Sequence, residues 1–127
     1  DKIFEGTYAL VAGQVLNDGE TKYIDNKSVA VIPADLPAET IARIQELAVE
    51  TYLALECEGF ARVDFFVEEA TGNIYLNEVN SLPGFTDISM YPKMWEQAGI
   101  STTDLLTKLI AYAEERHRDR KKNSIDC

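Results

Sequence analysis

The clearest hydrophobic pattern in the chain predicts a helix over residues 37–58. The apolar residues that recur at helical spacing are Ile41, Ile44, Leu47, Ala48 and Leu55. Such spacing is typical of a helix that packs one face against a core. Pro37 suits the first turn of a helix, and Gly59 stands where a carboxyl-terminal cap is expected.

A change to a β-rich pattern predicts an antiparallel hairpin after this helix. The runs FARVDFFVEE (60–69) and NIYLNEVN (73–80) are separated only by the residues ATG. A short glycine-containing break between two β-rich runs is typical of a hairpin.

The register of the hairpin decides which polar side chains meet. Residues two apart on a strand share a face, so Arg62 and Asp64 point together, as do Glu78 and Asn80. A hairpin centred near Thr71 places Asp64 opposite Glu78 and Arg62 opposite Asn80. A slip of one residue would send these side chains to opposite faces.

Two carboxylates that lie opposite each other on a sheet repel unless one is protonated or a cation lies between them. Carboxylate and amide oxygens suit Mg²⁺ or Mn²⁺. The pattern at Asp64, Glu78 and Asn80 is therefore compatible with a metal site, with Arg62 beside it to hold a phosphate. The alternative is that both carboxylates face solvent and Arg62 pairs with one of them. Spacing alone leaves both interpretations open.

The flanking segments complete an α+β class with an antiparallel sheet and packed helices. One strand is expected within 1–16, a turn at 17–20 and a short buried strand at 27–33. A short helix is expected at 92–98 and a longer one at about 102–118.

The longer helix has its own start signal and its own apolar face. Ser101 and Asp104 have the spacing of a capping box. The apolar stripe, expected to lie in the core, is Leu105, Leu109 and Tyr112, with Leu106, Ile110 and Ala113 beside it.

The segment that follows the hairpin is a loop with polar groups. Gly84 permits a close approach of the backbone to a ligand, and Thr86 and Ser89 offer hydroxyls. Successive N–H groups in such a loop can cradle an anion. Taken alone, such a loop is more often a plain turn than a binding site.

Composition and charge narrow the classes of function. The formal net charge of −10 argues against a nucleic-acid surface. The basic run 116–122, which includes His117, is expected to oppose a helix dipole. Two cysteines, Cys57 and Cys127, form no disulfide framework. There is no long apolar run and no signal-type amino terminus, so a cytoplasmic protein without membrane contact is expected.

The motifs GFARVDFF and YLNEVNSLPGFTDISMYPKMWEQAGIS, taken together, closely resemble the carboxyl-terminal part of bacterial D-alanine–D-alanine ligases of the ATP-grasp superfamily. The resemblance runs from about Lys22 to Ala113. It implies an ATP-grasp carboxyl-terminal lobe, with residues 1–127 as a single partial domain of a much longer ligase. The amino-terminal and central lobes of that ligase would lie outside this chain.

The resemblance implies an enzyme that joins two D-alanines with ATP, through an acyl phosphate, for peptidoglycan precursors and hence cell wall biogenesis and cell shape. The implied partners are D-alanine, ATP and, in the full-length protein, a second copy in a homodimer. The alternatives are a D-alanine–D-lactate or D-alanine–D-serine ligase, or an inactive isolated fragment. The flank ETKYIDNK favours D-alanine as the acceptor.

The resemblance also implies roles for individual residues. The residues implied to hold two Mg²⁺ or Mn²⁺ ions are Asp64, Glu78 and Asn80. Arg62 and the N–H of Gly84 would stabilise negative charge in the reaction, and Ser89 with the N–H of Met90 would bind the second D-alanine. The residues implied to contact ATP are Lys22, Leu76 and Asn77.

The chain departs from the family pattern in two places. The aromatic loop that precedes the E-x-K-Y sequence in family members is not present in VAGQVLNDGETKY. That loop closes the active site over the intermediate. Residues 1–10 are also expected to differ from the corresponding family strand.

Overall fold

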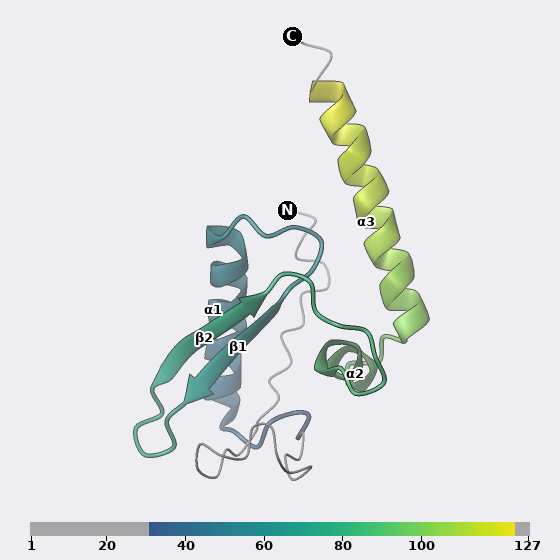
Figure 1. Cartoon of the computed structure of the whole chain (residues 1–127). Helices are drawn as coiled ribbons and strands as arrows, with labels where there is room; N and C mark the ends of the chain where they lie inside the picture. The colour runs from purple at the N-terminus through teal and green to yellow at the C-terminus, as the bar shows by residue number, and fades with distance from the viewer. Residues whose placement is uncertain (1–30, 124–127) are drawn as a thin grey trace.

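A computed structural model describes residues 31–123 of the chain (Figure 1). In chain order they form α1 (Ala38–Ala54), β1 (Arg62–Val67), β2 (Ile74–Asn80), α2 (Met90–Gln97) and α3 (Thr102–Asn123). The two strands pair in an antiparallel hairpin that α1 contacts, and α2 contacts α3. The predictions for 1–16 and 17–20, and most of that for 27–33, lie outside the described residues.

The predicted first helix is confirmed, but it ends earlier than expected and without the predicted cap. After Ala54 the chain forms a Schellman motif, in which the N–H of Glu56 donates to the carbonyl of Leu53 and the N–H of Cys57 to that of Tyr52. The left-handed position belongs to Glu56, with φ of 52°. Gly59 is therefore not the cap, because the helix has already ended before it.

The two later helices begin with recognisable signals. α2 starts two residues before the predicted position, so that Pro92 lies in its first turn, where proline is tolerated. At the start of α3 the N–H of Asp104 donates to Ser101 Oγ at 3.1 Å, and that hydroxyl donates to Asp104 Oδ2 at 2.8 Å. The predicted cap is confirmed, and α3 continues past residue 118 to Asn123.

The apolar stripe of α3 is less buried than the sequence predicted. Leu105 is buried, but Ile110 is 61% exposed, and Leu106, Tyr112 and Ala113 are also exposed. The expectation that the whole stripe lies in the core is wrong for this part of the chain. The start of α3 packs against α2, and a later turn contacts the rest of the chain through the ion pair of Arg116 with Glu58. The exposed apolar residues lie between these two contacts. No helix within 31–123 has the length and apolar character needed to cross a bilayer.

Candidate functional site

The hairpin has the register that the sequence predicts at its polar end. Asp64 pairs with Glu78 and Arg62 pairs with Asn80. All four side chains therefore belong to one face of the sheet, next to the point where β2 runs into the loop. The structure brings together the three predicted metal ligands and the predicted catalytic arginine.

A β-bulge, which the sequence did not indicate, interrupts this register. The pairing shifts between Asp64 and Phe65, so Phe65 lies opposite Leu76 and Asn77 is the extra residue of β2. Strict alternation would place Leu76 on the face of Glu78, but its pairing with Phe65 places it on the other face. The predicted ATP contacts Leu76 and Asn77 thus lie at the bulge, with Leu76 on the face opposite to Asp64 and Glu78.

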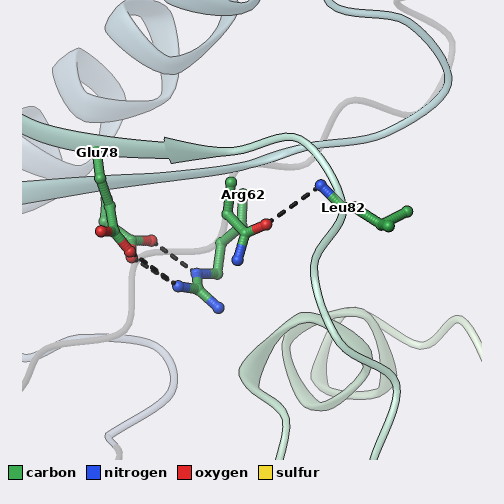
Figure 2. Close-up of polar contacts among 5 residues, drawn as sticks. Arg62, Glu78 and Leu82 are labelled. Atoms are coloured by element: carbon green, nitrogen blue, oxygen red, sulfur yellow. Dashed lines mark hydrogen bonds and ion pairs between the residues drawn. The ribbon is translucent and has the colours of Figure 1, made fainter.

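One edge of the Arg62 guanidinium faces both carboxylates (Figure 2). Its Nε is 2.8 Å from Asp64 Oδ1 and its Nη2 is 2.8 Å from Asp64 Oδ2, a bidentate pair. The same Nη2 reaches Glu78 Oε1 at 3.4 Å. The side chains are 24% exposed for Arg62, 31% for Asp64 and 58% for Glu78. The ion pair of the alternative interpretation is therefore present, and it involves both acids.

The electrostatics of this group are dominated by the bidentate pair. The hydrogen bond to Asp64 raises the pKa of Arg62, partial burial opposes this, and the charges of Asp64 and Glu78 raise the pKa further. The guanidinium therefore stays charged and supplies the cation that two opposed carboxylates require.

Asn80 marks the end of the sheet. Its side-chain Oδ1 accepts the N–H of Leu82 at 3.1 Å, an Asx turn that bends the chain out of β2 (Figure 2). An amide oxygen has two lone pairs, so one remains for a ligand. The Asx turn thus holds this oxygen at the edge of the polar group.

The loop after the hairpin is closed by Thr86 and Ser89. The N–H of Ser89 donates to the carbonyl of Thr86 at 2.9 Å, and the N–H of Thr86 donates to Ser89 Oγ at 3.0 Å. The two hydroxyl oxygens are 2.8 Å apart. Ser89 directly precedes α2, whose first N–H is that of Met90. The predicted acceptor-binding groups therefore lie together at the start of α2.

Gly84 lies against the same serine. A Cβ at position 84 would be 2.9 Å from Ser89 Oγ, closer than such atoms pack. A larger residue at position 84 would therefore displace the serine hydroxyl, whereas the φ of Gly84 is not in the left-handed region and makes no demand for glycine.

An aromatic cluster ties the loop to the base of the hairpin. Phe85 packs with its ring centroid 5.9 Å from Phe60, which precedes β1, and 5.5 Å from Tyr91 in α2. Tyr91 also packs on Trp95 at 6.3 Å. Burial raises the pKa of Tyr91, so its phenol stays neutral. The cluster therefore joins the loop to α2 and to the start of β1.

The donor atoms of the polar group decide whether it can hold a divalent cation. Within 31–123 no three or more His, Cys, Asp and Glu side chains gather as metal ligands. The donor set is instead two carboxylates and one amide oxygen, on neighbouring positions of one sheet face. Oxygen donors of this number suit Mg²⁺ or Mn²⁺, which keep waters or phosphate oxygens as further ligands. The residues fit such an ion, provided that the carboxylates are released from Arg62. Lys22 lies outside the described residues.

Comparison with known proteins identifies the family. Residues 5–111 match the family model described as D-ala D-ala ligase C-terminus. The D-alanine–D-alanine ligase of Acetivibrio thermocellus is 50% identical over 113 residues, covering 89% of this chain and 30% of that protein. The corresponding ligase of Solibacter usitatus is 54% identical over 104 residues, covering 82% of this chain and 32% of that protein.

Solved structures give the same result. The D-alanine–D-alanine ligase of Coxiella burnetii superposes with a TM-score of 0.68 and 42% identity, over 73% of this chain and 27% of that one. The Bacillus anthracis ligase complexed with ATP superposes with a TM-score of 0.67 and 33% identity, over 87% of this chain and 35% of that one. The predicted α+β class and ATP-grasp lobe are confirmed.

The matches also correct the predicted extent of the resemblance. The family match begins at residue 5 and not near Lys22, so the expectation that residues 1–10 depart from the family is wrong from residue 5 onward. The chain spans about a third of the length of the curated relatives it matches. The chain belongs to the D-alanine–D-alanine ligase family and corresponds to its carboxyl-terminal part.

Proposed function

We propose that the protein containing this chain joins two D-alanines to D-alanyl-D-alanine at the expense of ATP, for peptidoglycan precursor synthesis in the cytoplasm. The observation that carries the proposal is the convergence of three oxygen donors and Arg62 on one sheet face, in a chain of this family. We also propose that the full-length protein is a homodimer and that it contributes to cell wall biogenesis and cell shape.

The polar face is proposed as the part of the site that handles phosphate. Asp64, Glu78 and Asn80 would hold two Mg²⁺ or Mn²⁺ ions, which neutralise the charge on the ATP phosphates when bound. Arg62 then becomes available to face the acyl phosphate, with its planar donors suited to phosphate oxygens. Lys22, Leu76 and Asn77 are proposed to contact ATP.

The loop is proposed as the part of the site that handles the amino acids. The N–H of Gly84 would donate to the oxyanion that develops when the second amino acid attacks. Ser89 and the N–H of Met90 would bind the carboxylate of that second D-alanine, at the positive end of the α2 dipole.

Ser89→Ala is expected to raise the KM for the second D-alanine by about tenfold, because a hydrogen bond to a carboxylate is lost. The KM for ATP is expected to stay within about twofold of the parent value. Steady-state kinetics with each substrate varied in turn measures both constants. A larger change in the KM for ATP than in that for D-alanine would contradict the role of Ser89.

Gly84→Ala is expected to raise the same KM by about tenfold, because the new Cβ displaces Ser89 Oγ, only 2.9 Å away, while the N–H of residue 84 is retained. The test is the double variant. In a Ser89→Ala background only the Cβ of residue 89 remains within contact, at an ordinary 3.9 Å. Gly84→Ala should then have no further effect on the KM for D-alanine. An undiminished effect in that background would show that the clash is not with the serine hydroxyl.

A further inference from the structure

The hydroxyl of Ser89 is held by a residue with no role in the proposed chemistry. Thr86 is exposed and belongs to neither a helix nor a strand. Its N–H donates to Ser89 Oγ at 3.0 Å, its Oγ1 is 2.8 Å from the same oxygen, and its carbonyl accepts the N–H of Ser89 at 2.9 Å. Three contacts thus join these two residues on one turn of the loop.

The hydrogen-bonding capacity of a serine makes this arrangement informative. A hydroxyl has two lone pairs and a single proton. The N–H of Thr86 fills one lone pair, and the Thr86 hydroxyl can fill the other, since either oxygen of the pair can be the donor. When the Thr86 hydroxyl donates to Ser89 Oγ in this way, the hydroxyl proton of Ser89 is left for an acceptor outside the loop.

A carboxylate selects this orientation. An ionised carboxylate accepts hydrogen bonds and donates none, so it requires the serine proton. If the Ser89 proton were given to Thr86 instead, the substrate would face an oxygen lone pair and be repelled. The same hydroxyl of Thr86 therefore decides whether Ser89 acts as a donor.

We infer that Thr86 is a positioning residue, whose N–H and hydroxyl occupy both lone pairs of Ser89 Oγ so that the serine proton points to the acceptor carboxylate. The inference rests on the proposed function, in which Ser89 binds that carboxylate. It also bears on Gly84, because a Cβ at position 84 would lie 2.9 Å from the hydroxyl oxygen that Thr86 holds in place.

The test uses the complete protein that contains this chain. Thr86→Val keeps the branched shape and the backbone N–H but removes the donor hydroxyl, and Thr86→Ser restores it. Thr107→Val is the matched control, because Thr107 is an exposed threonine of α3 whose hydroxyl bonds the carbonyl of Thr103. Each variant is measured for kcat and for the KM of ATP and of the second D-alanine, alone and in a Ser89→Ala background.

Thr86→Val is expected to raise the KM for D-alanine about fivefold, with kcat and the KM for ATP within about twofold, and Thr86→Ser to restore the parent value. Thr107→Val should change none of the constants. In the Ser89→Ala background, Thr86→Val should have no further effect on the KM for D-alanine.

Three results would overturn the inference. Thr86→Val could raise the KM for ATP as much as that for D-alanine, or it could raise the KM for D-alanine just as much in the Ser89→Ala background. Thr86→Ser could also fail to restore the parent KM for D-alanine. If Ser89→Ala raises the KM for D-alanine while Thr86→Val does not, only the role of Thr86 fails. If Ser89→Ala itself leaves that KM unchanged, the proposed acceptor site fails as well.

Discussion

Glu78→Gln is expected to lower kcat by roughly a hundredfold to a thousandfold, while the free energy of unfolding changes by less than about 0.5 kcal/mol. Glutamine keeps the shape of the side chain but removes the charge of a proposed metal ligand. Stability should be preserved because the Glu78 side chain is 58% exposed and its contact with Arg62 is long, at 3.4 Å.

Two measurements test this expectation together: turnover at saturating Mg²⁺ and the thermal unfolding midpoint. Glu69→Gln is the matched control, since it removes the same charge from the exposed turn of the same hairpin. It should leave both quantities unchanged. Turnover of Glu78→Gln equal to that of the parent at saturating Mg²⁺ would refute the role of Glu78.

Arg62→Met is expected to have two separate effects. It should lower kcat by roughly a hundredfold, because a preorganised donor to the developing charge is lost. It should also lower the free energy of unfolding by up to about 1 kcal/mol without divalent cations, because Asp64 and Glu78 then lie opposite each other with no cation between them. Added Mg²⁺ should restore this stability, since the ion replaces the guanidinium.

Arg62→Lys separates charge from geometry. Lysine keeps a cation near the carboxylates but cannot reproduce the bidentate pair with Asp64, in which two nitrogens each lie 2.8 Å from an oxygen. It should recover the stability without recovering turnover. Arg43→Met, at an exposed arginine of α1 that pairs with Glu46, is the control for loss of a surface charge. A Mg²⁺-independent midpoint for Arg62→Met would show that no cation enters between the carboxylates.

The polar face was predictable because short-range signals agree there. The break near Thr71 and the alternation on both sides of it give the pairing of Asp64 with Glu78, and the structure has that pairing. The bulge at Asn77 was not predictable, since one extra residue in a strand leaves no mark in the hydrophobic pattern. Arg62 pairs with both acids, whereas the alternative interpretation expected it to pair with only one of them.

Contacts between segments that lie far apart in the sequence were the hardest to predict. Spacing gives no reason to join Phe60 to Phe85 and Tyr91, because the three belong to separate segments. The apolar stripe of α3 was correctly placed on one face, but periodicity does not say whether anything covers that face, and Ile110 is exposed. The end of α1 at Ala54 was missed because the left-handed residue that follows it is Glu56, and a glutamate in that region is uncommon.

The most direct test of the account is turnover of the complete protein with ATP and D-alanine, compared with D-alanine paired with D-lactate or D-serine. The expected result is release of phosphate with formation of D-alanyl-D-alanine, at a kcat/KM higher for D-alanine than for either alternative acceptor. Phosphate release only with some other carboxylate, or no turnover with D-alanine in the complete protein, would contradict it.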